Sequence, residues 1–169
     1  MRRVGIVLVA LGVVTAGVGL WRLVEGYDAP SAGRSGHALA ALVHDAGPAH
    51  APFPGLTETR IAVGDRSLRV VVADSDAERS EGLRRRRNLG GYDGMLFAYE
   101  TPTTVGFTMS TVPVALDIAF YDGHGRVVDR LHMKPCSGTD SQCPVYLASG
   151  PFRYALETLA GRLPRGRLG

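Results

Sequence analysis

Two cysteines are the residues of this sequence with the clearest chemical potential. Cys136 and Cys143 lie in residues 134–144, a polar stretch that contains a glycine. Outside the cytoplasm such a pair forms a disulfide. Closing the eight residues from Cys136 to Cys143 would stabilise the fold by about 2.5 kcal/mol in the chain-entropy model. A metal site that adds His132 is one alternative and a redox pair is another, although the spacing is not Cys-x-x-Cys. We predict a structural disulfide.

Four consecutive arginines form the strongest cluster of charge: Arg84, Arg85, Arg86 and Arg87. They follow residues 75–78, whose sequence Ser-Asp-Ala-Glu is a capping box that predicts a short helix beginning after Ser75. In the favoured interpretation, the arginines occupy the solvated last turn of this helix and complement its dipole. In the alternative they are an anion-binding site for lipid headgroups or a cell-wall polymer.

Asp117 is the acidic residue whose position is most suggestive of a site. It interrupts an apolar strand pattern and lies on the face opposite the apolar side chains. A catalytic acid usually needs a partner group, and the sequence offers none at an informative spacing. No residue is therefore assigned as catalytic. The candidate residues of a ligand-binding cleft are Arg79, Met109, Thr111 and Asp117.

Motifs of several common enzyme classes are absent from the sequence. It contains no serine nucleophile elbow, no phosphate-binding loop and no dinucleotide fingerprint. His37, His44 and His50 match the spacing of no standard metal site. We accordingly predict neither a cofactor nor a bound metal.

Alternation of apolar and polar residues dominates residues 56–169. This period of two is typical of strands. Residues 61–72 read as a hairpin around Gly64-Asp65, and further strands are expected over residues 105–109, 116–120, 126–133 and 152–158. Residues 90–94 predict turns. The predicted fold is mainly β: a small jelly-roll-like sandwich or partly open barrel with one short helix.

The first 25 residues predict a transmembrane anchor. Arg2 and Arg3 precede eighteen uncharged residues, 4–21, whose helical length of about 27 Å nearly spans a bilayer core of about 30 Å. Residues 4–24 would cross the membrane, with the N-terminus in the cytoplasm and the remainder outside. The alternative is a signal peptide whose cleavage would release a secreted protein.

Composition divides the rest of the chain into a linker and a domain. Residues 26–55 are rich in alanine, glycine and proline and predict a flexible linker. Residues 56–169 then form one β-sandwich domain. The 169 residues, 45% of them hydrophobic, have room for one ordinary core. Residues 56–169 have a net charge of only +2, which makes nucleic acid a poor partner for an exported domain.

Several short segments, taken in order, resemble the bacterial domain-of-unknown-function family 192. They are residues 78–83, 94–97, 107–109, 116–120, 135–136, 143–144 and 153–157, the last reading Arg-Tyr-Ala-Leu-Glu. The resemblance covers most of residues 56–161. It implies a small jelly-roll-like sandwich, often exported, without an established activity. The family pattern usually reads Phe-Trp-Met-Lys-Asn-Thr from Phe107, whereas Thr108, Ser110 and Thr111 here replace the Trp, Lys and Asn.

These features together predict a membrane-anchored extracytoplasmic domain. We expect a noncatalytic binding or structural module of the cell envelope, whose partners are the membrane itself and an anionic lipid or cell-wall polymer. The alternative is an envelope enzyme or small-ligand binder with a cleft around Asp117.

Overall fold

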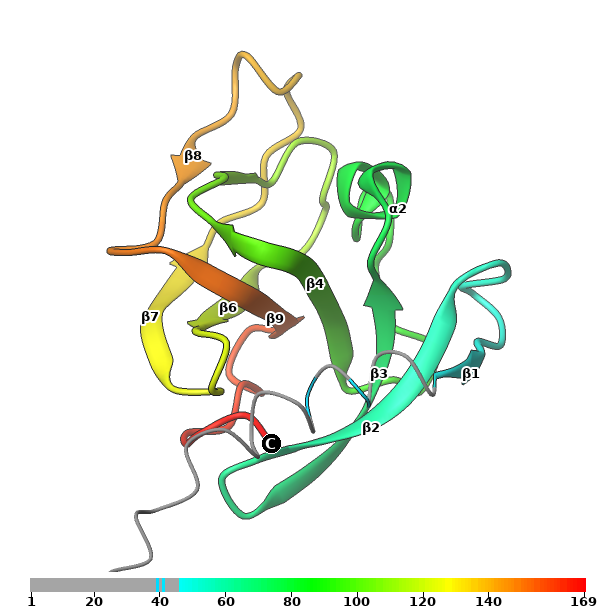
Figure 1. Cartoon of the computed structure of the whole chain (residues 1–169). Coiled ribbons are helices and arrows are strands. Elements are labelled where there is room, and N and C mark those ends of the chain that lie inside the picture. Colours follow the sequence, from blue (N-terminus) through cyan, green and yellow to red (C-terminus); the bar gives the residue numbers. More distant parts are fainter. Residues whose placement is uncertain (1–38, 40, 42–45) are drawn as a thin grey trace, which may run out of the picture.

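A curved sheet and a short helix make up most of the structure (Figure 1). The structure is a computed structural model that describes residues 39, 41 and 46–169. The strands are β1 (Gly47–Pro48), β2 (Thr57–Val63), β3 (Arg66–Ala73), β4 (Gly94–Thr103), β5 (Phe107–Thr108), β6 (Leu116–Tyr121), β7 (Val127–Met133), β8 (Val145–Tyr146) and β9 (Phe152–Leu159). The helix within residues 46–169 is α2 (Asp76–Glu81).

The strands pair into two sheets. Seven of them lie in the order β1-β2-β3-β4-β9-β6-β7, and β5 and β8 form a separate two-stranded sheet. Strands β3 and β4 run parallel, whereas the other neighbours in the large sheet are antiparallel. The prediction of a mainly β domain with one short helix is confirmed for the described residues, in which the large sheet does not close into a barrel.

The large sheet buries apolar side chains on both faces. One face, which we call the phenylalanine face, carries Phe97 and Phe120 in a cluster. The other, the tyrosine face, carries Tyr121 and Tyr154. The C-terminal residues cover the tyrosine face, where Leu168 is fully buried. The next residue, Gly169, exchanges two backbone hydrogen bonds with Ala62.

The hairpin predicted around Gly64-Asp65 is confirmed. Strands β2 and β3 pair as far as Val63 and Arg66, so Gly64 and Asp65 between them form the turn. Gly64 has a φ of 60°, which glycine adopts without steric cost. The strands predicted over residues 116–120, 126–133 and 152–158 are present as β6, β7 and β9.

The predicted helix begins where the capping box places it but ends early. The Ser75 hydroxyl accepts a hydrogen bond from the Glu78 amide at 3.3 Å, and the Glu78 carboxylate accepts one from the Ser75 amide at 3.0 Å. Gly82, with a φ of 50°, ends the helix after Glu81. The prediction that the four arginines 84–87 occupy the last turn is therefore wrong, and that turn contains Arg79 instead.

The alternation pattern misses β4, which spans ten residues. Its first five residues, 94–98, are all buried, because β4 lies between β3 and β9 and both of its faces are covered. A strand that is covered on both faces has a continuous apolar run in place of alternation. Residues 90–93 do form turns and bends, as predicted, but Gly94 already belongs to the strand.

Part of the predicted linker contributes to the core. Strand β1 pairs with β2. Phe53 is fully buried and packs edge-to-face on Tyr92, with ring centroids 5.7 Å apart. A composition rich in alanine, glycine and proline conceals this contribution, because among the described linker residues only Leu39 and Phe53 are buried apolar side chains.

The predicted membrane span, residues 4–24, lies outside the described residues. In the part of the chain that the structure does describe, no helix combines the length and the apolar character needed to cross a bilayer.

We expect Phe53→Ala to lower the free energy of unfolding by about 3–5 kcal/mol, because the substitution leaves a cavity in the core. Urea denaturation followed by circular dichroism measures this loss. Leu147→Ala is the control, since Leu147 is 60% exposed and its truncation should change stability by less than about 0.5 kcal/mol. Equal losses in the two variants would show that residues 47–53 do not support the core.

Candidate functional site

A cavity of about 390 Å³ opens on the phenylalanine face. Its lining comes from helix α2, the residues that follow it, strands β4, β5 and β9, and Asp140 in the loop before β8. These segments are far apart in the sequence, and the fold brings them together around one cavity.

Glu157 lies at the buried base of this cavity. It is in the middle of β9 and pairs with Met95 of β4 and Ile118 of β6. Because side chains alternate along a strand, Glu157 shares the phenylalanine face with Ala155. The residue is only 4% exposed. Its carboxyl group forms no hydrogen bond or ion pair with another described residue.

Burial raises the pKa of Glu157 to about 8. The physical cause is desolvation, because a carboxylate removed from water loses its hydration and gains no compensating donor or positive charge here. The carboxyl group is therefore mostly protonated at neutral pH. Such a group can donate a hydrogen bond, and it ionises when a positive charge or a higher pH favours the anion.

Aromatic rings form the walls of the cavity. Phe97 and Tyr99 come from β4, and Phe107 comes from β5. The rings of Phe97 and Phe107 pack edge-to-face at 5.0 Å between centroids. Burial raises the pKa of Tyr99 to about 12, so its hydroxyl stays neutral. Leu83 and Val112 add aliphatic surface.

Arg79 of α2 lies at the rim. Its guanidinium lies over the Tyr99 ring, 4.8 Å from the centroid. It donates to the carbonyl oxygens of Asp74 and Ala98, the latter at 2.8 Å. It also forms an ion pair of 2.6 Å with Asp76. These contacts hold the charge of Arg79 at a defined place above the aromatic wall.

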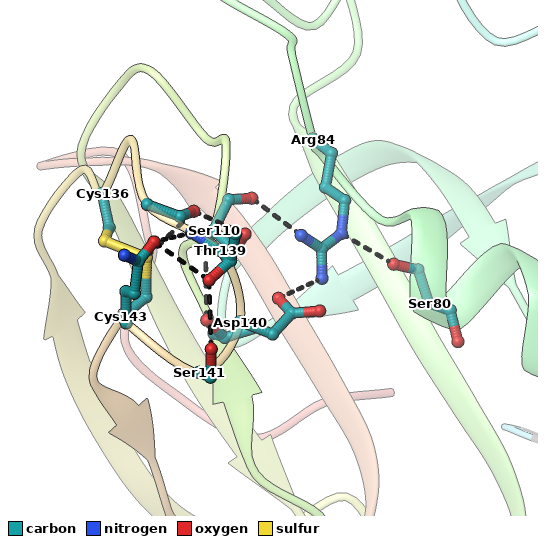
Figure 2. Close-up of polar contacts among 11 residues, drawn as sticks. Ser80, Arg84, Ser110, Cys136, Thr139, Asp140, Ser141 and Cys143 are labelled. Carbon is teal, nitrogen blue, oxygen red and sulfur yellow. Dashed lines mark hydrogen bonds and ion pairs between the residues drawn. A yellow bond between two sulfur atoms is a disulfide. The ribbon is translucent and has the colours of Figure 1, made fainter.

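Arg84 connects the helix region to the loop before β8. Its guanidinium donates to the carbonyl oxygens of Ser80 and Ser110, each at 3.0 Å. It forms an ion pair of 2.7 Å with Asp140, and Figure 2 shows the three contacts around one guanidinium. The adjacent arginine lowers the pKa of the Asp140 carboxyl, so Asp140 stays ionised.

A disulfide closes the loop that carries Asp140. Cys136 and Cys143 are bonded to each other (Figure 2). The Ser110 hydroxyl donates to the carbonyl of Gly138 at 2.8 Å, which fixes the loop from inside. The disulfide and this hydrogen bond together keep Asp140 opposite Arg84 at the rim.

The charges around the cavity balance in pairs, with one exception. Asp76 pairs with Arg79, Asp140 with Arg84, and Glu81 with Arg85. Of the acidic residues in the described lining, Glu157 alone has no such partner. The cavity thus combines an aromatic wall, a neutralised rim and one unpaired buried carboxyl group.

Residues 59–168 match a known family, DUF192, whose description is Uncharacterized ACR. The chain belongs to the DUF192 family. This match confirms the resemblance read from the short sequence segments. No curated protein matches the chain.

Two solved structures resemble this DUF192 chain. A protein of unknown function from Novosphingobium aromaticivorans DSM 12444 has a TM-score of 0.61 and 28% identity, over 75% of this chain and 95% of that one. A protein from Sinorhizobium meliloti 1021, provisionally described as a transcription regulator, has a TM-score of 0.55 and 25% identity, over 65% and 89% of the two chains.

The structure does not bring the four candidate cleft residues together. Arg79 lines the cavity, whereas Met109 is fully buried in the core beside it. Thr111 has a φ of 59°, and its buried hydroxyl has no hydrogen-bond partner among the described residues. Asp117 lies on the tyrosine face. Its carboxylate contacts Nδ1 of His132 at 2.7 Å and accepts from the Gly161 amide at 2.6 Å.

The four arginines of the run 84–87 have four different environments in the DUF192 domain. Arg84 pairs with Asp140, and Arg85 pairs with Glu81. Arg86 donates to the Pro52 carbonyl at 2.7 Å and lies 4.3 Å from the centroid of the Phe53 ring. Arg87 is exposed. The structure thus divides the run, and its proposed anion binding stays a prediction.

The predicted disulfide between Cys136 and Cys143 is present in the structure. His132 contacts Asp117 and neither cysteine. His37 and His44 lie outside the described residues. Within the described residues, no three His, Cys, Asp or Glu side chains group as ligands of a metal ion.

Glu157 is the site residue that the sequence reasoning missed. Glu157 lies in residues 153–157, one of the segments that resemble the family, and in the last predicted strand. The sequence alone assigns no role to it. The alternation pattern could have identified Glu157 as a core position, because Ala155 and Leu159, two residues before and after it, are both apolar. An acid at a core position of a strand needs a partner or a function. Only the structure reveals that the partner is missing.

The departures from the family pattern cluster around the same cavity. Thr108 lines it directly, so the residue that replaces the usual tryptophan is part of the wall. Ser110 accepts from Arg84 through its carbonyl and holds the disulfide loop through its hydroxyl. Thr111, the next residue, has a positive φ of 59°. Of these positions, Thr108 lines the cavity, and Ser110 contacts the rim residue Arg84.

We expect stability to fall with rising pH because of Glu157. Its pKa is raised in the folded state, so its stabilising contribution is complete below the unfolded value of about 4.3 and is lost as pH rises through about 8. Between about pH 5 and pH 8 the chain should lose about 3 kcal/mol relative to Glu157→Gln, which has no charge to bury. Urea titrations of both chains across this range measure the difference. A constant difference would contradict the buried, unpaired state of Glu157.

Proposed function

We propose that this DUF192 domain is an extracytoplasmic binding module that takes a small ligand into the Glu157 cavity. The observation that carries the proposal is the unpaired, 4% exposed carboxyl group at the base of an aromatic-walled cavity of about 390 Å³. Ligand sites combine a concave apolar surface of about 300–1,000 Å³ with a few polar groups that fix orientation. A buried polar group without a partner calls for an explanation, and a bound ligand supplies one.

Binding explains the described cavity better than catalysis. The donors of Arg79 and Arg84 are engaged with backbone carbonyls and paired carboxylates. Glu157 has no ionisable partner with which to share a proton. An envelope enzyme built on Asp117 has less support, because both carboxylate oxygens of Asp117 are engaged and the residue lies on the opposite face of the sheet from Glu157.

The proposed location outside the cytoplasm has two supports. Residues 4–24 contain an uncharged run of membrane length behind two arginines, which is the pattern of an anchor with a cytoplasmic N-terminus. The disulfide agrees with an oxidising compartment. In this proposal the residues before Gly47 tether the domain to the outer surface of the membrane.

We expect a set of small neutral, cationic and anionic fragments to include binders that shift the methyl resonances of Leu83, Val105 and Val112, which line the cavity. Thr108→Trp should weaken these binders at least about tenfold, or about 1.4 kcal/mol, because the indole fills space that the threonine leaves open. Methyl NMR on the 169-residue chain in a nonionic detergent measures both effects.

Thr101→Trp is the matched control for this substitution. Thr101 is exposed in β4 and does not line the cavity, so its variant should bind the fragments as the unaltered chain does. Fragment shifts that survive in Thr108→Trp, or a complete lack of binders, would contradict the proposed ligand site.

We expect the chain to remain in the membrane fraction after alkaline carbonate extraction, with no free thiol after acid quenching of whole cells. A variant that lacks residues 1–24 should stay in the cytoplasm and label at both Cys136 and Cys143, because that compartment keeps thiols reduced. Release of the full chain by carbonate would support the secreted alternative. Free thiols in the full chain would contradict export.

A further inference from the structure

Glu157 has no charged partner among the described residues. Its carboxyl group meets no cation among the described residues, since the two lining arginines are paired with Asp76 and Asp140. A buried carboxylate is stable when a charge of opposite sign or several donors approach it. The residues that the structure describes supply neither at this position. A ligand that completes the site would therefore bring the positive charge with it.

The walls of the cavity suit an organic cation rather than a hydrated metal ion. Phe97 and Phe107 contribute aromatic rings, whereas the Arg79 guanidinium already lies over the ring of Tyr99. The faces of such rings attract ammonium groups through their quadrupole, and cages of this kind recognise quaternary ammonium ions. A metal ion would instead need several oxygen ligands, and Glu157 is the single unpaired carboxyl group in the described lining.

The rim disfavours an anionic ligand. Such a ligand would have to displace Asp76 from Arg79 or Asp140 from Arg84, across ion pairs of 2.6 and 2.7 Å. It would also approach the carboxyl group of Glu157. A cation breaks neither ion pair, and the described lining contains three rim carboxylates, Asp76, Glu81 and Asp140, against the two guanidinium groups of Arg79 and Arg84.

We propose that the Glu157 cavity binds a small organic ammonium ion, held between the Glu157 carboxylate and the rings of Phe97 and Phe107. This inference rests on the proposed ligand-binding function and names its ligand class. Binding requires the carboxylate form, so each bound cation releases the proton of Glu157. The groups that face Glu157 in this process are Tyr99 on β4, the rim pairs Asp76–Arg79 and Asp140–Arg84, and Glu81 on α2.

The experiment uses choline and its uncharged isostere 3,3-dimethyl-1-butanol as probes. Isothermal titration calorimetry measures both on the 169-residue chain in a nonionic detergent. Choline keeps its charge at every pH, so any change in its affinity arises in the protein. With a pKa of about 8, the ionised fraction of Glu157 rises roughly ninetyfold between about pH 6 and pH 9. We expect choline to bind at least about tenfold more tightly at the higher pH and to bind more tightly there than the isostere.

Two variants with the same change of charge complete the design. Glu157→Gln should remove the pH dependence and weaken choline at least about tenfold at the higher pH. Glu100→Gln, altered at an exposed position next to Tyr99 in sequence, should bind choline as the unaltered chain does.

Each outcome separates the ammonium proposal from the ligand-binding proposal. Choline and the isostere could bind equally well at both pH values, with both affinities reduced by Thr108→Trp. That result would overturn the ammonium inference but would still support a ligand-binding cavity. Tighter binding at low pH would also overturn it, because the protonated acid would then be the recognition group. Failure of both probes at both pH values overturns the ammonium inference, and the fragment set then decides whether the cavity binds anything.

Discussion

The pairing of β9 between β4 and β6 is the arrangement on which the cavity depends. It places every second side chain of β9 against the apolar phenylalanine face, and one of these side chains is the acid Glu157. Strand pairing leaves the carboxyl group no freedom to turn toward bulk water, since a shift of one residue would move the whole strand to the wrong face. The acid is therefore held in the core by the same register that buries Ala155. Its raised pKa follows from this placement rather than from a neighbouring charge.

The rim of the cavity is assembled by constraints that are independent of the sheet. The capping box at Ser75 sets the start of α2, and Gly82 sets its end, so Arg79 projects over Tyr99 while Arg84 lies beyond the helix. The disulfide and the Ser110 hydroxyl place the loop that carries Asp140. Two ion pairs then neutralise the arginines that would otherwise attract anions or stabilise the Glu157 carboxylate. The charges at the rim of the cavity are therefore paired, whereas the Glu157 carboxyl group at its base has no charged partner among the described residues.

Local patterns predicted most of the elements, because each depends on residues close in sequence. The Gly64-Asp65 hairpin, the capping box and the cysteine pair are all local signals, and the structure contains each of them. The alternation pattern does not identify β4, because burial on both faces gives a strand a continuous apolar run. Local patterns do not identify this cavity, because its lining residues are distant in sequence. Arg84 and Asp140 are 56 residues apart, and nothing in the sequence near either residue indicates that they form an ion pair. Asp117 and Glu157 are both acids within strands, but Glu157 lies on the phenylalanine face without a partner among the described residues, whereas Asp117 contacts His132 and Gly161.

An unpaired acid at a core position breaks a packing rule, whereas the cap at Ser75 and the turn at Gly64 agree with the fold. Proteins that are otherwise locally consistent tend to break such rules where function requires it. Leucine or glutamine at position 157 would relieve the desolvation of the carboxylate and stabilise the domain at neutral pH, so stability alone does not account for glutamate. Hydrogen bonding within the described protein does not account for it either, because desolvation alone sets the pKa of this carboxyl group. What the glutamate does provide is a group that is nearly neutral in the empty cavity and becomes an anion when a cation enters. A site of this kind tolerates the absence of its ligand and strengthens when the ligand is present, which is the behaviour required of a reversible receptor for a positively charged group.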